Sequence, residues 1–394
     1  MTSPATTRAP VRSRARLDAI DPAGAALVRQ LLALAPTGLA AGHDPATGGF
    51  AQTVRGLSGT PGTRLQRQGD NLRYAAMAAL GLARVPVEQQ RQVLAGGTAA
   101  ELAARTAERA VDHRDPGAVA LAAWARAEVN GAFAGELFDA LDGRLGAGVA
   151  LPTVDASWAV TAATVAAGLG DTSRILHLGT RLLLDHRGTG GIFPHWLPPT
   201  AQPRWRGHVG CFADQVYPIQ ALARVAALTG RGDCLAAANR TASRICELQG
   251  EHGQWWWHYD IRNGGVVEKF PVYSVHQHAM GPMALFDLLE AGGDDHTAAV
   301  ARGLAWLQTH PEVVEELVSP RFGVIWRKVG RREPPKAARA VNTATTAVRV
   351  GAHLPGIDRL LPPTSVDHEC RPYELGWLLH AWLPPTPSTE MSAR

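Results

Sequence analysis

The chain has 394 residues, of which 46% are hydrophobic and 19% are charged, and its formal net charge is +4. This is the balance of a globular protein, and it excludes wholesale disorder, a collagen-like fibre and a coiled coil. Tryptophan is unusually frequent, with 11 residues against 8 phenylalanines and 5 tyrosines.

The same numbers bound the surroundings of the protein. We find no apolar run close to the ~18–20 residues that span a bilayer, and the basic N-terminus lacks the apolar core of a secretion signal. We therefore predict no transmembrane segment and a cytoplasmic location with reduced cysteines. The basic residues are scattered, so no nucleic-acid partner is expected. The oligomeric state stays open.

The domain prediction has three parts. Residues 1–16 form a disordered basic tail, residues 17–385 a single domain, and residues 386–394 a second disordered tail. Within the domain, segments rich in Ala and Leu have helical spacing. In chain order these predicted helices are Asp18–Leu34, Asn71–Ala83, Ala99–Val111, Gly117–Val129, Phe133–Leu145, Ser157–Ala167, Ser173–Asp185, Val216–Leu228, Cys234–Leu248, His276–Glu290, Thr297–Thr309, Ala337–Gly351 and Tyr373–Trp382.

Loops rich in Gly, Pro and Trp separate these helices and recur with a similar form. Gly191, Gly253 and Gly323 mark three of them at intervals of roughly 60–70 residues, the length of a helical hairpin with its return loop. About six such pairs fill the chain. We therefore predict an all-α fold, an (α/α)6 toroid of helical hairpins around a central cavity, with an open helical solenoid as the alternative. The apolar segment Ser157–Ala167 suits an inner helix, and the amphipathic segment Ser173–Asp185 an outer one.

An acid stands at the start of one predicted inner helix. Asp214 is followed by Gln215 and Tyr217. A first-turn carboxylate is favoured by the helix dipole, which is a purely structural role. Alternatively the carboxyl faces the cavity, where loss of solvent raises its pKa and makes it a proton donor, with Tyr217 beside it.

A run of aromatic residues follows, from Trp255 to Asp260. On an extended segment, alternation places Trp255, Trp257 and Tyr259 on one side and Trp256, His258 and Asp260 on the other. One side then anchors the loop, and the other lines a pocket as an aromatic wall for a sugar face or a cation.

Two histidines begin the next helix. His276 or His278, preceded by Tyr273, is a candidate acid–base partner for Asp214 or Asp260. An HxH pair alone is a weak zinc signal, so we predict neither a metal nor a cofactor. The remaining predicted substrate-binding residues lie at other helix entries and loops and are His195, Trp196, Arg73, Arg371 and Tyr373.

The pattern Gln249-x3-Gly253-x-Trp255 resembles the repeated QW motif of squalene–hopene cyclases and related terpenoid cyclases. Those proteins share an α/α toroid with protein prenyltransferase β-subunits. The resemblance implies this fold, and it implies that Asp214 stands where the cyclases carry their protonating acid. The DxDD motif of the cyclases is absent, and the prenyltransferase zinc ligands have no match.

The chain also looks similar to unsaturated glucuronyl hydrolases and N-acylglucosamine epimerases in length and in its Trp-, His- and Tyr-rich loops. Three interpretations follow. The first is a terpenoid-cyclase-like enzyme in which Asp214 protonates an isoprenoid. The second is a carbohydrate-active hydrolase, lyase or epimerase with Asp214 or Asp260 and a histidine as acid and base. The third is a helical-repeat binding scaffold. A purely apolar cavity with one acid favours an isoprenoid, and several Asp, Glu, Arg and His side chains among the tryptophans favour a sugar.

Overall fold

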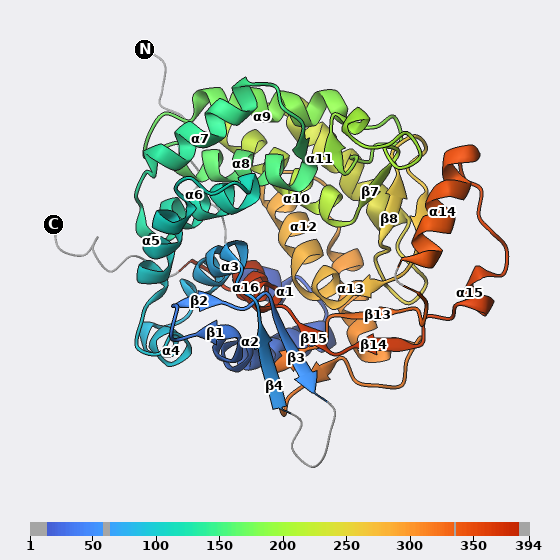
Figure 1. The fold of residues 1–394 in the computed structure, drawn as a ribbon, viewed down its shortest axis with the longest axis horizontal. Coiled ribbons are helices and arrows are strands. Elements are labelled where there is room, and N and C mark those ends of the chain that lie inside the picture. The colour runs from blue at the N-terminus through green and yellow to red at the C-terminus, as the bar shows by residue number, and fades with distance from the viewer. Residues whose placement is uncertain (1–13, 58–63, 335, 386–394) are drawn as a thin grey trace.

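The computed structural model describes residues 14–57, 64–334 and 336–385. Within them, an inner ring of helices follows the chain (Figure 1). Each inner helix contacts the next, and the last returns to the first, so the ring is closed and the predicted (α/α)6 toroid is confirmed. The inner helices are α3 (Leu72–Leu82), α6 (Pro116–Asn130), α8 (Thr153–Ala166), α10 (Ala213–Thr229), α12 (Gly281–Glu290) and α16 (Pro372–Trp382).

A second layer of helices packs around this ring, and the difference between the layers follows from the sequence. In α8 nearly every side chain is buried, as an inner helix requires. In the outer helix α9, Ile175 and Leu183 face inward, while Arg174 and Arg181 stay exposed. The outer helices are α2 (Pro22–Gly42), α5 (Ala99–Ala110), α7 (Gly135–Gly146), α9 (Ser173–His186), α11 (Gly232–Glu247) and α13 (Thr297–Thr309).

Shorter helices complete the described chain. A single π turn, η2 (His276–Met280), leads directly into α12, and a short 3-10 turn, η1, spans Pro199–Ala201. Most of these short helices lie outside the double ring, and α14 and α15 project from its side in Figure 1. They are α1 (Arg14–Asp18), α4 (Val87–Val93), α14 (Ala337–Val348) and α15 (Ile357–Leu360).

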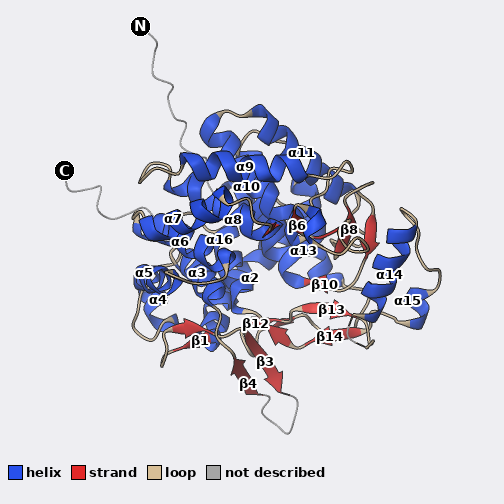
Figure 2. Cartoon of the chain, turned by 45° about the horizontal axis from the view of Figure 1, so that its top comes forward, coloured by secondary structure: helices blue, strands red, loops and turns tan. Residues whose placement is uncertain are grey.

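The returns between hairpins, which we predicted as loops, contain short antiparallel strands (Figure 2). They pair as β1–β2, β15–β3–β4, β5–β6, β7–β8–β9, β10–β13–β14 and β11–β12. The strands are β1 (His43–Asp44), β2 (Gly49–Phe50), β3 (Thr53–Leu57), β4 (Arg64–Gln68), β5 (Leu151–Pro152), β6 (Trp196–Leu197), β7 (Val209–Cys211), β8 (His258–Asp260), β9 (Val266–Glu268), β10 (Val272–Tyr273), β11 (Val318–Ser319), β12 (Val324–Ile325), β13 (Lys328–Gly330), β14 (Ser365–Asp367) and β15 (Glu369–Cys370).

Helix α2 corrects the expectation that no apolar run comes close to the length of a membrane span. Among the described residues it is the helix that is long and apolar enough, by length and composition alone, to cross a membrane. Half of its apolar window is buried inside the protein, and it packs against α16. Its apolar length therefore belongs to the outer layer of the toroid.

The carboxyl-terminal ends of the inner helices are tied together by buried charges. Arg16 of α1 donates to Asp287 and Glu290 of α12, each at 2.7 Å, and to the carbonyl oxygen of Ala381 in α16. Arg224 of α10 also donates to Asp287, at 2.8 Å. Arg16, the last residue of the predicted tail, therefore packs against the toroid, while residues 1–13 and 386–394 of the two predicted tails lie outside the described residues.

A second acid extends the same network. Glu128 of α6 accepts hydrogen bonds from Arg84, which follows α3, from Trp124 and from His380 of α16. Burial would raise the pKa of Glu128, but His380, Arg84 and Arg224 hold it well below its ordinary value. Charged side chains from five inner helices or their ends thus close one end of the ring.

The ring closes where α3 meets α16, and two glycines allow the approach. A Cβ on Gly376 would lie 2.5 Å from the carbonyl oxygen of Met77, and one on Gly81 would overlap the backbone of Gly376. No side chain fits in this contact, since real Cβ atoms do not approach backbone so closely.

We therefore expect Gly376→Ala to lower the free energy of unfolding by about 1–3 kcal/mol, because α16 must shift away from α3. Gly143→Ala in α7 is the matched control, since nothing lies within 4 Å of the added methyl group. That control should stabilise the protein slightly, by ~0.4–1 kcal/mol. Urea unfolding of both variants tests the contact, and equal effects would contradict it.

Candidate active site

The amino-terminal ends of the inner helices carry a second group of polar side chains. Arg73 lies in the first turn of α3, Asp155 in the first turn of α8, and Asp214 in the first turn of α10, while Asp115 is the N-cap of α6. Contacts between these residues bridge neighbouring helices. The chemistry-bearing residues therefore gather at the end of the ring opposite the Arg16 network.

Arg73 holds two carboxylates at once. Its Nε donates to Asp115 at 2.6 Å, and its two terminal nitrogens lie 3.0 and 3.1 Å from the oxygens of Asp155. Its guanidinium centre is 5.1 Å from the ring centroid of Trp158. Gly117 leaves the room for this arrangement, since a Cβ there would lie 2.6 Å from the Cζ atom of Arg73.

Of the two carboxyl groups that Arg73 contacts, Asp155 is the one that titrates near neutral pH. Its burial raises its pKa to about 6, against the opposing effect of Arg73, and the negative charge of Asp115 adds to the rise. A carboxyl with this pKa is present in both protonation states near neutral pH. It is therefore suited to donate or accept a proton in a reaction.

His195 and Asp214 form the second pair. The Nδ1 atom of His195 lies 2.9 Å from Oδ2 of Asp214, which is fully buried and also accepts the backbone N–H of Cys211 at 2.7 Å. The charge of Asp214 raises the pKa of His195 to about 11, against the effect of burial. The ring is therefore an imidazolium at neutral pH, and its side chain is 39% exposed.

The structure thus changes the expected role of Asp214. It does begin an inner helix, as predicted. Its carboxylate oxygens, however, are engaged within the protein, because they lie in hydrogen-bond contact with the ring of His195 and accept the backbone N–H of Cys211. The charge of His195 also lowers the pKa of Asp155, so the two pairs share one site.

A metal ion could be bound at one point of this site. The ligand atoms of His195, Cys211 and Asp214 lie within 4.8 Å of one another. A nitrogen, a sulfur and a carboxylate oxygen are ligands that Zn²⁺ accepts. The direct hydrogen bond between His195 and Asp214 already uses two of these ligand atoms, and it matches an acid–base pair.

An aromatic wall stands beside these pairs. The ring of Trp257 is parallel to that of His276, with centroids 6.1 Å apart and planes at 8°, and it lies 4.7 Å from the ring of Tyr273. Burial lowers the pKa of His276 to about 3, so this ring is neutral. Tyr217 packs edge-on against Trp158 and accepts a hydrogen bond from Trp377 at 2.8 Å, while burial raises its pKa well above the ordinary value. Tyr217 is therefore held as a neutral phenol.

The alternation predicted for the tryptophan run is wrong, because strand β8 begins only at His258. Trp255 and Tyr259 are fully buried, and Trp256 packs against Phe270. Trp257 and His258 are neighbours at the site, with ring centroids 5.0 Å apart.

Two predicted acid–base candidates lie elsewhere. Asp260 pairs with Arg262 at 2.6 Å in the turn after β8. His278 is fully buried in the π turn, where burial lowers its pKa to about 3. Its backbone oxygen accepts from Trp382 at 2.7 Å, so it packs against α16 rather than pairing with Asp214.

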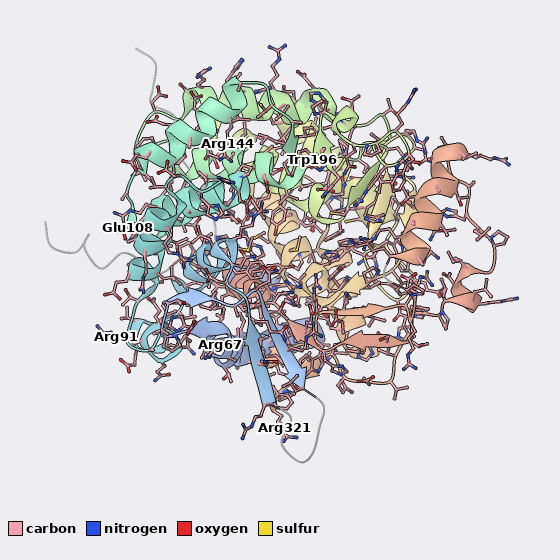
Figure 3. All side chains as sticks on the ribbon, viewed as in Figure 1. Arg67, Arg91, Glu108, Arg144, Trp196 and Arg321 are labelled. Atoms are coloured by element: carbon pink, nitrogen blue, oxygen red, sulfur yellow. The ribbon has the colours of Figure 1, made fainter. Side chains whose placement is uncertain are left out.

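Trp196, in β6, is half-buried and is labelled on the face shown in Figure 3.

The entry to α16 completes the site. Arg371 donates to Glu369 at 3.1 Å, and the ring of Tyr373 lies 4.8 Å from that of Tyr74. Glu374 is fully buried, and neither of its oxygens has a hydrogen-bond partner among the described residues. Burial raises the pKa of Glu374 to about 8, so it is a neutral acid at physiological pH.

Asp155, Glu374, Arg327 and Arg339 belong to this end of the ring and were not among the predicted site residues. Asp155 was the easiest of the four to predict from the sequence, because it precedes the apolar segment Ser157–Ala167 much as Asp214 precedes its own helix. Arg327 lies with its guanidinium centre 5.2 Å from the ring centroid of Tyr273, and Arg339 lies 5.1 Å from that of Trp257. These two contacts join residues that are far apart in the sequence, so no local sequence pattern predicts them.

A separate cavity of about 640 Å³ lies outside the ring, between β9, α14 and α15. Glu268, Arg331 and Asn342 are among its lining residues. None of the predicted site residues lines it. It is therefore distinct from the polar end of the ring.

No protein-family model matches the sequence, and no curated protein matches it. Solved structures do resemble it. Cellobiose 2-epimerase from Bacillus thermoamylovorans has a TM-score of 0.60 at 10% identity, over 91% of this chain and 98% of its own. An unsaturated glucuronyl hydrolase specific for heparin has a TM-score of 0.58 at 12% identity, over 91% and 96%. A sugar epimerase from a ruminal bacterium has a TM-score of 0.58 at 13% identity, over 90% and 97%. At these identities the similarity establishes the α/α toroid fold.

Proposed function

We propose that this protein is a carbohydrate-active enzyme of the hydrolase or epimerase kind, and that Asp155 moves the proton. The observation that carries the proposal is the composition of the polar end of the ring. Arg73, Asp155, His195 and Glu374 stand there among aromatic rings, and a polyhydroxylated ligand needs such a mixture of donors, acceptors and stacking faces. The sugar-active toroids among the similar structures support the same conclusion.

An isoprenoid substrate fits this site poorly. Carbocation chemistry calls for an apolar aromatic cavity with one acid, whereas this end of the ring carries several arginines and carboxyls, and an apolar ligand would give Glu374 and the Nε of Arg339 no hydrogen-bond partner. The similar structures also give no support to the terpenoid-cyclase interpretation, and the saccharide alternative therefore replaces it.

The residues divide the work as follows. Trp257, which is half-buried, offers an aromatic surface for a pyranose ring, and Tyr273 and His276 pack against it. Asp155 exchanges the proton, with Arg73 fixing its orientation. The imidazolium of His195 stabilises negative charge that develops on a substrate oxygen, and Asp214 holds that ring in place as a positioning residue.

Hydrolysis and epimerisation use Asp155 in opposite states, so the pH dependence separates them. A hydrolase needs the protonated acid to protonate the glycosidic oxygen, and its activity falls as the pH rises through about 6. An epimerase needs the carboxylate to remove a proton next to a carbonyl, and its activity rises through the same pH.

The test is turnover of a panel of mono- and disaccharides followed by ¹H NMR from pH 4 to 8. The expected result is conversion of at least one saccharide with an inflection near pH 6. Conversion that does not change between pH 5 and pH 7 would contradict the role of Asp155. Conversion of an isoprenoid alcohol, with no saccharide converted, would contradict the proposed function.

A further inference from the structure

Two arginines at the polar end of the ring have no counter-charge. Arg339 of α14 lies over Trp257, and its buried Nε has no hydrogen-bond partner. Arg206 lies in the turn before β7. Within the described parts of the chain, neither side chain forms an ion pair or a hydrogen bond.

Their neighbours make this unusual. Arg73 is paired with Asp115 and Asp155, Arg327 with Glu369, and Arg262 with Asp260. Both side chains are half-buried, and a cation that has lost part of its solvent without gaining an anion is one that an anionic ligand can neutralise.

The two arginines act on the same place. The positive charge of Arg206 acts on both Arg339 and His258, and together with burial it lowers the pKa of Arg339. Arg206 stands shortly before Val209, which begins β7 and pairs with Asp260 at the end of β8, the strand that His258 begins.

The nearest carboxylate is already engaged. Glu268 of β9 acts weakly on Arg339, but its oxygens accept from Arg331, from Asn342 and from the backbone N–H of Phe270. It has no oxygen left to neutralise a further guanidinium.

Trp257, which Arg339 contacts, and its neighbour His258 both carry unpaired nitrogen atoms. The Nε1–H of Trp257 and the Nδ1 of His258 are both buried without a partner among the described residues, and His258 is only 5% exposed. With the Nε–H of Arg339, three polar nitrogens lack a hydrogen-bond partner among the described residues. The Trp257 Nε1–H and the Arg339 Nε–H can only donate. Such a site selects an acceptor-rich anion.

We propose that Arg206 and Arg339 bind the phosphate group of a phosphorylated saccharide, which lies against Trp257 and His258. A phosphate monoester carries a charge close to −2 and three acceptor oxygens, which match two unpaired cations and the surrounding donors. A carboxylate would neutralise only one of them. This inference rests on the proposed function, since it names the substrate class at the same site.

Isothermal titration calorimetry tests the proposal with glucose 1-phosphate, glucose 6-phosphate, glucuronate and glucose as probes. We expect at least one sugar phosphate to bind on the order of 10- to 100-fold more tightly than glucose and more tightly than glucuronate. Arg339→Gln and Arg206→Gln should each remove most of that gain. Arg349→Gln, at the exposed end of the same helix, is the matched control and should leave it unchanged.

Sugar phosphates that bind no better than glucose, or glucuronate that binds as tightly as they do, would overturn the proposal. Loss of binding equally in Arg349→Gln would do the same. If Arg339→Gln does not fold by circular dichroism, Arg206→Gln decides. Phosphate binding without turnover of any saccharide would refute the proposed function alone, and turnover of neutral sugars without phosphate preference would refute this inference alone.

Discussion

Asp155→Asn is expected to lower the turnover number by ~100- to 10,000-fold, the usual contribution of a general acid or base. The amide has the shape of the carboxyl but neither donates nor accepts a proton at physiological pH. Substrate binding should change much less, because Arg73 retains Asp115 as a partner. The measurement is steady-state kinetics on the saccharide that the wild-type protein converts.

The matched control is Asp139→Asn, on the exposed face of the outer helix α7. It should keep full activity. Urea unfolding should show that Asp155→Asn is still folded, since a neutral amide costs less to bury than a carboxylate. A turnover number within threefold of the wild type would remove Asp155 from the reaction.

Arg16→Ala is expected to lower the free energy of unfolding by about 3–5 kcal/mol, because it removes a buried arginine that neutralises Asp287 together with Arg224 and that pairs with Glu290. Asp287 keeps only Arg224 and Gln220, and Glu290 loses both of its contacts with Arg16. The variant lies at the closed end of the ring, so the activity of the molecules that remain folded should be unchanged. Urea unfolding at neutral pH measures the loss.

The pH dependence of this loss has a definite sign. Arg224 and Arg16 lower the pKa of Asp287 below the ordinary value, against the effect of burial. The stabilisation from this ion pair is therefore present above the ordinary Asp pKa of about 3.9, and it fades as the pH falls below it. The difference between wild type and Arg16→Ala should shrink in acid. Arg29→Ala, an exposed position on α2, is the control, and an equal loss there would contradict the account.

Much of the fold was predictable from the sequence because it rests on short-range patterns. The apolar segment Ser157–Ala167 and the amphipathic Ser173–Asp185 became the inner helix α8 and the outer helix α9. The recurring Gly-rich returns gave the number of hairpins. The contact that closes the ring was not predictable, because it joins Gly81 to Gly376 across most of the chain.

The site was predictable only in part, for the same physical reason. An acid at the start of an inner helix was the signal that selected Asp214, and Asp155 carries the same signal at the start of α8. The two acids differ in their partners, His195 for Asp214 and Arg73 for Asp155, and the sequence does not place these partners side by side with the acids. The tryptophan run misled because alternation holds for a strand, and three of its residues precede β8.

The most direct test of the account is a ¹H NMR time course in D₂O of a saccharide panel with wild-type protein and Asp155→Asn. The account predicts that the wild type cleaves a glycosidic bond or exchanges a carbon-bound hydrogen for deuterium in at least one saccharide, and that Asp155→Asn does neither at a comparable rate. Equal conversion by both proteins would contradict the account.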